Sequence, residues 1–372
     1  MDATTLVTPP YVAGPFRLDP FVALMLKPSR VGDPSTGRAF ARPYKDVAQR
    51  LARWQERGLV DRATTPALYL HEYTANGITV RGLVGALDVS RRARRPEDRA
   101  VLPHEGIHPA QADDLAARMA EMRMNPAPIL LVHRGSARLR QLTGEVRAGS
   151  PDVTFTDRSQ QQHRLWSVTD PTVLAELARE LSTTRALIAD GHHRYAAYLR
   201  LQQREQGRGY DRGLAMLVDQ ADTPLFLGPI HRSLAGTSLE DLRGAAAALD
   251  LTMTPLPQSE AVAALAPDRL VATDGRDWAV LTLDIAPGTA AVEIVHRHLL
   301  PALPHGPSSV GYHHTVESAL ERAIPEHDIA LLMPAPSVDL ALSIAEADRL
   351  LPEKATSFQP KPSLGVLIRP LD

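Results

Sequence analysis

The chain has 372 residues, of which 44% are hydrophobic and 23% are charged, and its formal net charge at pH 7 is −2. These numbers describe an ordinary globular protein of two or three domains, with no general attraction to nucleic acid or to anionic membranes. The absence of cysteine excludes disulfides, thiolate metal ligands and cysteine nucleophiles. The sequence shows no signal-peptide pattern and no membrane-spanning apolar run, so we expect a cytoplasmic protein.

The periodicity of apolar residues predicts strands and helices that mix without strict alternation. In chain order we expect a strand at 21–26, a helix at 46–58, a hairpin over 68–89, a helix at 110–124, a strand at 128–132, a helix at 171–181, a strand at 186–189, a helix at 192–206, strands at 214–218 and 225–230, and a last strand at 364–368. This mixture predicts an α/β fold class, with an α+β arrangement around a mixed sheet.

The segment from Ile188 to Arg200 is the most informative part of the chain. A short apolar run ends in Asp190-Gly191, and apolar residues then return at helical spacing after His192, His193 and Arg194. Gly191 allows a tight bend, and the start of the following helix offers N–H groups and the positive end of a dipole. The pattern predicts a phosphate-binding turn. The alternative is an aspartate that caps a helix, with solvated histidine and arginine beyond it.

The string from His104 to His108 matches the H-E-x-x-H motif of zinc proteases, but Pro103, Gly106 and Pro109 argue against the continuous helix that this chemistry needs.

Lysine is rare in this chain. Only four of the 41 basic residues are lysine, and two of them lie in the segment 351–361. Because a chain rich in arginine can retain lysine where a compact ammonium is needed, this segment is a candidate to face a ligand, the alternative being a surface loop.

On these residues the chain resembles the DUF1015 family over nearly its full length. The matching pieces are Pro43-Tyr44 with Asp46, His104-Glu105, Arg123-Met124-Asn125 before Pro128-Ile129, Asp190-Gly191-His192-His193-Arg194-Tyr195, His231-Arg232, and Leu351 to Lys361 leading into Gly365. The chain departs from the family pattern in three places, with Lys45 inserted after Pro43-Tyr44, Leu115 in place of a common arginine, and a less aromatic stretch at 357–359.

Residues 100–205 also resemble the ParB/sulfiredoxin fold, and in particular the free serine kinases of that superfamily. The resemblance implies three regions: an N-terminal α+β region at 1–100, a ParB/sulfiredoxin-like nucleotide-binding core at 101–235, and a C-terminal α/β region at 236–372. It also implies that Glu105 and Asp190 are the functional carboxylates.

The function that the resemblance implies is transfer of a phosphoryl group from ATP or ADP to a hydroxyl acceptor, with free L-serine as the first candidate. Glu105 would be the base, Asp190 would orient the acceptor or help to hold Mg²⁺, and the turn formed by Gly191, His192, His193 and Arg194 would hold the nucleotide phosphates. Candidates for contacts to the substrate are His104, His231, Arg232 and Lys354. The rival interpretation is a ParB-like nucleotide-binding regulatory protein, but the near-neutral charge does not favour a nucleic-acid partner. The oligomeric state stays open.

Overall fold

The computed structural model describes residues 6–33, 47–205 and 209–371, and the chain divides into two compact units. Unit 1 contains residues 1–225 together with the C-terminal residues 360–372, and unit 2 contains residues 226–359. The boundary predicted at residue 235 therefore lies ten residues beyond the observed one. The boundary predicted at residue 100 falls inside unit 1, because strands from both sides of it pair in one sheet.

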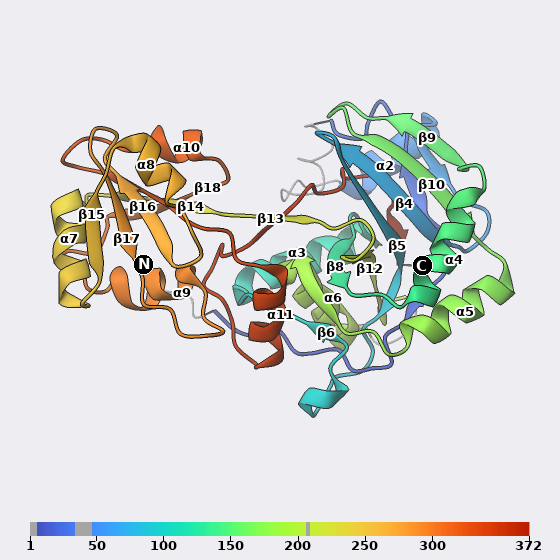
Figure 1. Cartoon of the computed structure of the whole chain (residues 1–372). Helices are drawn as coiled ribbons and strands as arrows, with labels where there is room; N and C mark the ends of the chain where they lie inside the picture. Colours follow the sequence, from blue (N-terminus) through green and yellow to red (C-terminus); the bar gives the residue numbers. More distant parts are fainter. Residues whose placement is uncertain (1–5, 34–46, 206–208, 372) are drawn as a thin grey trace. The chain divides into compact units, whose positions relative to one another are not determined.

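Unit 1 is built on a nine-stranded mixed sheet with the order β6-β11-β8-β12-β5-β4-β10-β9, in which β1 also pairs with β5 (Figure 1). Two pairs, β6 with β11 and β8 with β12, are parallel, and the other pairs are antiparallel. The strands are β1 (Leu18–Asp19), β4 (Leu68–Ala75), β5 (Ile78–Asp88), β6 (Val101–Leu102), β8 (Ile129–His133), β9 (Val153–Thr156), β10 (Gln162–Val168), β11 (Ala186–Asp190) and β12 (Arg212–Asp219). The predicted mixed α+β class is confirmed.

Helices cover this sheet and two short strand pairs extend unit 1. The helices are α2 (Val47–Glu56), α3 (Pro109–Met122), α4 (Ala137–Ala148), α5 (Pro171–Leu181) and α6 (His192–Arg204), with a 3-10 turn at Pro96–Asp98. The short pairs are β2 (Leu24–Leu26) with β3 (Val60–Arg62), and β7 (Met124–Asn125) with β21 (Arg369–Pro370). Helix α3 packs on α6, and α4 packs on α5, on β4 and on β10. One apolar core runs between the helices and the sheet.

Unit 2 is a six-stranded antiparallel sheet with the order β15-β17-β16-β19-β14-β18. Its strands are β14 (His231–Ala235), β15 (Thr252–Pro255), β16 (Arg269–Thr273), β17 (Trp278–Thr282), β18 (Ser309–His313) and β19 (Ile329–Leu332), and β13 (Phe226–Gly228) pairs separately with β20 (Ser357–Gln359). Its helices are α7 (Leu239–Ala248), α8 (Gln258–Ala263), α9 (Ala291–Ile294), which continues as a π-helical turn at Val295–Leu299, α10 (Val316–Leu320) and α11 (Val338–Glu346). Two apolar clusters form its core.

Local sequence signals explain most of the elements of unit 1. The hairpin turns at Asn76 and Gly77, whose φ angles of 50° and 78° suit the asparagine–glycine pair. Helix α5 starts with Pro171 after Asp170, whose carboxylate accepts hydrogen bonds from the N–H groups of Thr172 and Val173.

Across the described parts of the chain, no helix combines the length and apolarity that a membrane crossing requires.

The strand predicted at 364–368 is wrong. Residues 364 and 365 form a turn, and only Ile368 makes an isolated bridge, to Leu24. Gly365 has a φ of +89°, and a β-carbon there would lie 2.4 Å from Leu26. Three backbone hydrogen bonds still join this segment to β2, from Leu24 N to Ile368 O, from Ile368 N to Leu24 O and from Leu26 N to Gly365 O, but the turn at Gly365 interrupts a continuous ladder.

Candidate functional site

The turn from strand β11 into helix α6 has the geometry that its sequence predicts. The side chains from Ala186 to Ala189 are buried, and Gly191 is the N-cap of α6 with φ 99° and ψ 31°. A β-carbon on Gly191 would lie 3.0 Å from both the Arg194 guanidinium and the Ile129 side chain. Glycine is therefore the residue that allows this bend, and the first N–H groups of α6 follow it directly.

Helix α6 is fixed beneath this turn by two buried tyrosines. The Tyr195 hydroxyl donates to Pro10 O at 2.8 Å and accepts from the N–H of Val12 at 3.0 Å. The Tyr198 hydroxyl lies 3.1 Å from Leu214 O, on the neighbouring strand β12. Because these contacts join α6 to the sheet and to the N-terminal segment, the start of the helix has a fixed position.

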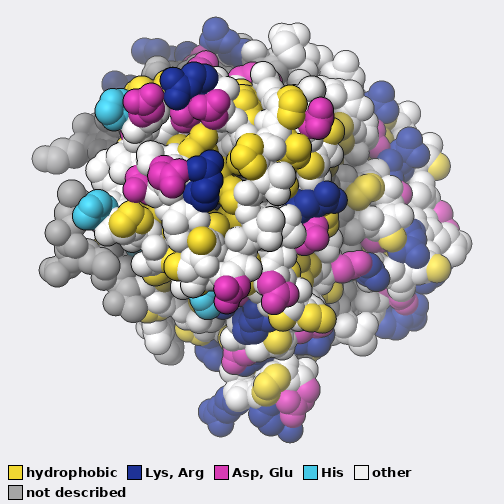
Figure 2. Space-filling view, turned by 60° about the vertical axis from the view of Figure 1, so that its left-hand side comes forward, with side chains coloured by type: hydrophobic (Ala, Val, Ile, Leu, Met, Phe, Trp, Pro, Cys, Tyr) yellow, Lys and Arg dark blue, Asp and Glu magenta, His cyan; other side chains and the backbone are white. Residues whose placement is uncertain are grey.

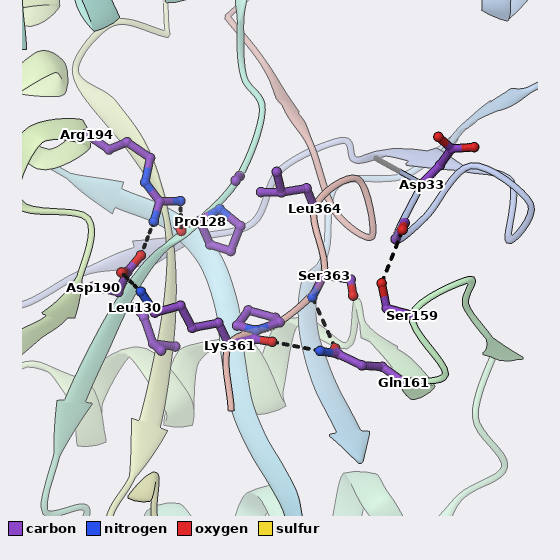
Figure 3. A pocket seen from close by; sticks show the side chains of 13 residues that line it. Asp33, Pro128, Leu130, Ser159, Gln161, Asp190, Arg194, Lys361, Ser363 and Leu364 are labelled. Atoms are coloured by element: carbon purple, nitrogen blue, oxygen red, sulfur yellow. Dashed lines mark hydrogen bonds and ion pairs between the residues drawn. The ribbon is translucent and has the colours of Figure 1, made fainter. Parts of the chain in front are cut away.

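Asp190, at the end of β11, lies between two cations (Figure 3). Its Oδ2 pairs with Arg194, and its Oδ1 lies 2.5 Å from Nζ of Lys361. Burial by itself would raise the pKa of Asp190, but Arg194 and Lys361 outweigh it and hold that pKa below its usual range. Two cations and one carboxylate leave a local formal charge of +1, which favours an anionic ligand.

This charged cluster lines a cavity of about 430 Å³ in unit 1. The volume lies within the range of about 300–1,000 Å³ that is usual for small-molecule sites. The lining combines a few polar groups with apolar side chains: Gly32, Asp33, Ala127, Pro128, Leu130, Ser159, Gln161, Asp190, Arg194, Lys361, Pro362, Ser363 and Leu364. The second Arg194 contact, from Nη1 to Pro128 O at 2.6 Å, holds the guanidinium at the cavity wall.

The two histidines of the turn hold the segment that carries Glu105. Nε2 of His192 accepts from the N–H of His104 at 3.3 Å, and Nε2 of His193 accepts from the N–H of His108 at 3.0 Å. Burial, then His104 and His193, lower the pKa of His192 well below its usual value, so the ring is neutral. These contacts differ from the phosphate contacts that the sequence predicts for the two imidazoles.

Glu105 and His104 lie in an extended segment that precedes α3, so the helix required by the zinc-protease motif does not form. The Glu105 side chain is 19% exposed, and one of its oxygens lies 4.0 Å from Nε2 of His104. His104 is fully buried, and burial lowers its pKa to about 3. Because its ring is neutral and buried, His104 is better suited to pack beside Glu105 than to contact a substrate. Glu105 is not among the residues that line the 430 Å³ cavity.

The other three candidates for substrate contacts belong to unit 2. Nδ1 of His231 accepts from the N–H of Met333 at 3.0 Å, and Arg232 is 1% exposed, with Nη2 donating to Lys354 O at 2.9 Å. Lys354 has an exposed side chain and a φ of 55°. The Arg232 guanidinium also bonds the backbone of Ile230, which is typical of a structural role in holding loops together.

In this structure Asp190 has no carboxylate oxygen open to a magnesium ion, and its role as a metal ligand stays a prediction. Both carboxylate oxygens of Asp190 are paired with cations, and a metal ion would compete with them for the same oxygens. Within residues 6–33, 47–205 and 209–371, no group of three or more histidine, aspartate or glutamate side chains is placed to hold a metal ion. We therefore assign no metal-binding residue.

Several site residues escaped the sequence analysis. Lys361, Gln161, Ser159 and Ser363 line the cavity, although only the lysine had a signal in the sequence, namely the rarity of that residue type in this chain. The rarity of lysine predicts that the segment 351–361 faces a ligand, and the structure places Lys361, and not Lys354, at the cavity. Pro43, Tyr44 and Asp46 of the family pattern lie outside the described residues.

Residues 17–293 match the family described as "Protein of unknown function (DUF1015)", and the chain belongs to this family. No curated protein matches the chain. Similar solved structures include SbnI with a C-terminal truncation from Staphylococcus aureus, at 11% identity over 73% of this chain and 84% of that one, with a TM-score of 0.42. A free serine kinase mutant in complex with ADP is also similar, at 12% identity over 72% of this chain and 89% of that one, with a TM-score of 0.41. The same mutant in complex with AMP is similar at 12% identity over 77% of this chain and 92% of that one, with a TM-score of 0.43. At this identity the likeness carries no function to this chain.

Proposed function

We propose that this member of the DUF1015 family is a small-molecule kinase, which transfers a phosphoryl group from ATP or ADP to a hydroxyl acceptor, with free L-serine as the first candidate. The observation that carries the proposal is the cavity at the β11–α6 turn, where Asp190, Arg194 and Lys361 meet. Phosphoryl transfer depends on positioning and on neutralising negative charge more than on covalent chemistry. The cluster of Asp190, Arg194 and Lys361 carries a net positive charge at the wall of the cavity, beside a helix N-terminus, and supplies both; Asp33, the other carboxylate of the lining, pairs with Arg158.

The nucleotide phosphates would lie against the first turn of α6. Gly191 has no side chain to block the approach, the helix N-terminus favours negative charge, and Arg194 lines the cavity with its guanidinium held in place. Two carboxylates line this cavity, Asp33 and Asp190, and Asp190 is the one beside Arg194 that would accept a hydrogen bond from the acceptor, either from its hydroxyl or from an ammonium group. The resemblance to free serine kinases in the residues from Asp190 to Arg194 supports the same arrangement.

The proposed base is Glu105, which the resemblance to free serine kinases implies and which lies outside the lining of the cavity. The acceptor oxygen attacks the terminal phosphorus, the bond from phosphorus to the nucleotide's bridging oxygen breaks, and the hydroxyl proton passes to Glu105. The segment of Glu105 is tied to the first turn of α6 through His192 and His193. The base and the phosphate-binding turn would therefore keep a fixed relation to each other. The cofactor Mg²⁺ would accompany the nucleotide, with no protein ligand assigned.

A nucleotide-binding regulatory protein of the ParB type is the alternative. The surface seen in Figure 2 carries basic and acidic side chains interspersed, and a continuous basic face is not visible on the side that it presents. Interspersed charge gives little attraction to the nucleic-acid backbone, so this face does not favour a nucleic-acid partner.

The test incubates the purified protein with MgATP or MgADP and a panel of hydroxylated acceptors that begins with L-serine. Mass spectrometry should detect a phosphorylated acceptor with the wild type and almost none with Asp190→Asn. The control is Asp113→Asn, which removes an exposed carboxylate of α3 that pairs with Arg200 and Arg204. Nucleotide binding without a phosphorylated product across the whole panel would contradict the kinase and favour the regulatory protein.

A further inference from the structure

The C-terminal residues from 360 onward belong to unit 1, residues 361–364 form one wall of the cavity, and two side chains of unit 1 fix the backbone there. The Tyr73 hydroxyl donates to Pro360 O at 2.6 Å. Gln161 clamps the next peptide groups, since its Nε2 donates to Lys361 O at 3.0 Å and its Oε1 accepts from the N–H of Ser363 at 3.2 Å (Figure 3). Lys361 thus projects from a backbone that is held on both sides.

A buried hydrogen-bond network of Asp157, His163 and His71 holds the loop that carries Gln161. Asp157 accepts from the N–H groups of Ser159 and Gln161 at 2.8 and 2.9 Å, and its carboxylate also bonds the Ser363 side chain. Nε2 of His163 lies 3.1 Å from Asp157, and Nδ1 of His163 lies 3.1 Å from Nε2 of His71. Both imidazoles are buried, and burial lowers the pKa of each. The hydrogen bonds of the Asp157 carboxylate fix the backbone of the loop from Asp157 to Gln161.

The ion pair of Lys361 with Asp190 adds little to the stability of the fold. The Lys361 side chain is 45% exposed, and exposed ion pairs contribute about 0–1 kcal/mol. Arg194 already neutralises Asp190, so Lys361 adds a second positive charge to one carboxylate, at the wall of a cavity. Lysine also has a compact ammonium on a flexible stem, which can move between neighbouring anions. These features point to a ligand as the partner of the ammonium.

We propose that Lys361 is a ligand-binding residue of this cavity. Its ammonium pairs with Asp190 in the free protein and moves to pair with a phosphoryl oxygen when the nucleotide binds. A polyphosphate carries more negative charge than a carboxylate, so it draws the ammonium from Asp190 Oδ1. That oxygen then becomes available to the acceptor. The inference rests on the proposed nucleotide site. It assigns to that site a phosphate-binding residue, Lys361, that lies 171 positions after Asp190 in the chain.

The test measures ATP affinity by calorimetry for Lys361→Met, which keeps most of the stem and removes the charge. The matched control is Lys27→Met, because Lys27 is equally exposed, at 43%, and pairs with Asp61 in the same unit. We expect Lys361→Met to weaken ATP binding by about ten- to hundredfold. Its urea midpoint should equal that of the wild type, and Lys27→Met should bind ATP normally.

The outcomes separate this inference from the kinase proposal. Equal ATP affinity of Lys361→Met and the wild type would overturn the role of Lys361, whatever the turnover. A wild type that binds ATP through Lys361 but phosphorylates no acceptor would leave this inference standing and contradict the kinase. If the wild type binds neither ATP, ADP nor inorganic pyrophosphate, the inference is wrong together with the nucleotide site. Lys361→Arg should restore part of the affinity, because it restores the charge without the compact shape.

Discussion

Replacing Gly191 with alanine tests the turn on which the site depends. A non-glycine residue with a φ of +99° is strained, and left-handed backbone costs such residues about 1–2 kcal/mol. The new β-carbon would also lie 3.0 Å from Ile129, in the buried strand β8, and 3.0 Å from the Arg194 guanidinium. Since Arg194 is tied to Pro128 O, neither neighbour gives way without loss. We expect Gly191→Ala to lower the free energy of unfolding of unit 1 by about 1–3 kcal/mol.

The chain offers a matched control in Gly144 of helix α4. Its backbone φ is not positive, and a β-carbon there would meet nothing within 4 Å. Gly144→Ala should therefore stabilise the helix by about 0.5–1 kcal/mol, because alanine loses less backbone entropy than glycine on folding. The same chemical change should have opposite signs at the two positions.

The assay is urea unfolding followed by tryptophan fluorescence. Of the three tryptophans, Trp54 and Trp166 lie in unit 1 and Trp278 lies in unit 2, so all variants carry Trp278→Phe and the signal reports unit 1. Gly191→Ala should lower the urea midpoint without changing the slope of the transition. A midpoint equal to or above that of Gly144→Ala would refute the account of the turn.

Three further predictions concern catalysis, packing and pH. Glu105→Gln should lower kcat by about 10²–10⁴-fold and leave the Kd of the nucleotide unchanged, and equal kcat values would exclude Glu105 as the base. Tyr195→Phe should cost about 1–3 kcal/mol of stability in the same urea assay, because it leaves the buried Val12 N–H without its acceptor, and a loss below 0.5 kcal/mol would contradict this. Burial lowers the pKa of His104 from 6.5 to about 3, so between these values the unfolded chain binds one more proton than the folded chain. The free energy of unfolding is therefore fully retained above pH 6.5 and falls below it, by about 1.4 kcal/mol per pH unit for each buried neutral histidine of this kind. Urea midpoints at pH 7.5, 6.5 and 5.5 should fall in that order. A urea midpoint that does not change with pH would contradict the neutral buried ring.

The turn at Gly191 could be predicted because all its signals are local. An apolar run, a glycine and a return of apolar residues at helical spacing lie within thirteen positions, and the structure places a buried strand, an N-cap and a helix there. Lys361 could not be predicted in the same way, because 171 positions separate it from Asp190 and only the fold brings them together. The rarity of lysine indicated the right segment but did not select between Lys354 and Lys361.

Prediction is weaker where one residue type serves two purposes. A histidine at a helix start can bind phosphate or accept a backbone N–H, and local pattern does not decide between the two for His192, whose Nε2 accepts from the N–H of His104 in the structure. An apolar run such as 364–368 can form a strand or fill a core, and here Gly365 turns the chain against Leu26. The ParB/sulfiredoxin-like core and the roles of Glu105 and Asp190 stay predictions.

The most direct test of the account follows both products of one reaction. With MgATP, or MgADP as the donor, and an acceptor from the hydroxyl panel present, the amount of phosphorylated acceptor should equal the amount of nucleotide consumed, and omission of the acceptor should stop consumption. Quantitative mass spectrometry of the quenched mixture measures both amounts in the same sample. Equal amounts that depend on Asp190 would support phosphoryl transfer at the β11–α6 turn. Nucleotide consumption that is independent of every acceptor and releases inorganic phosphate, or no consumption at all, would contradict it.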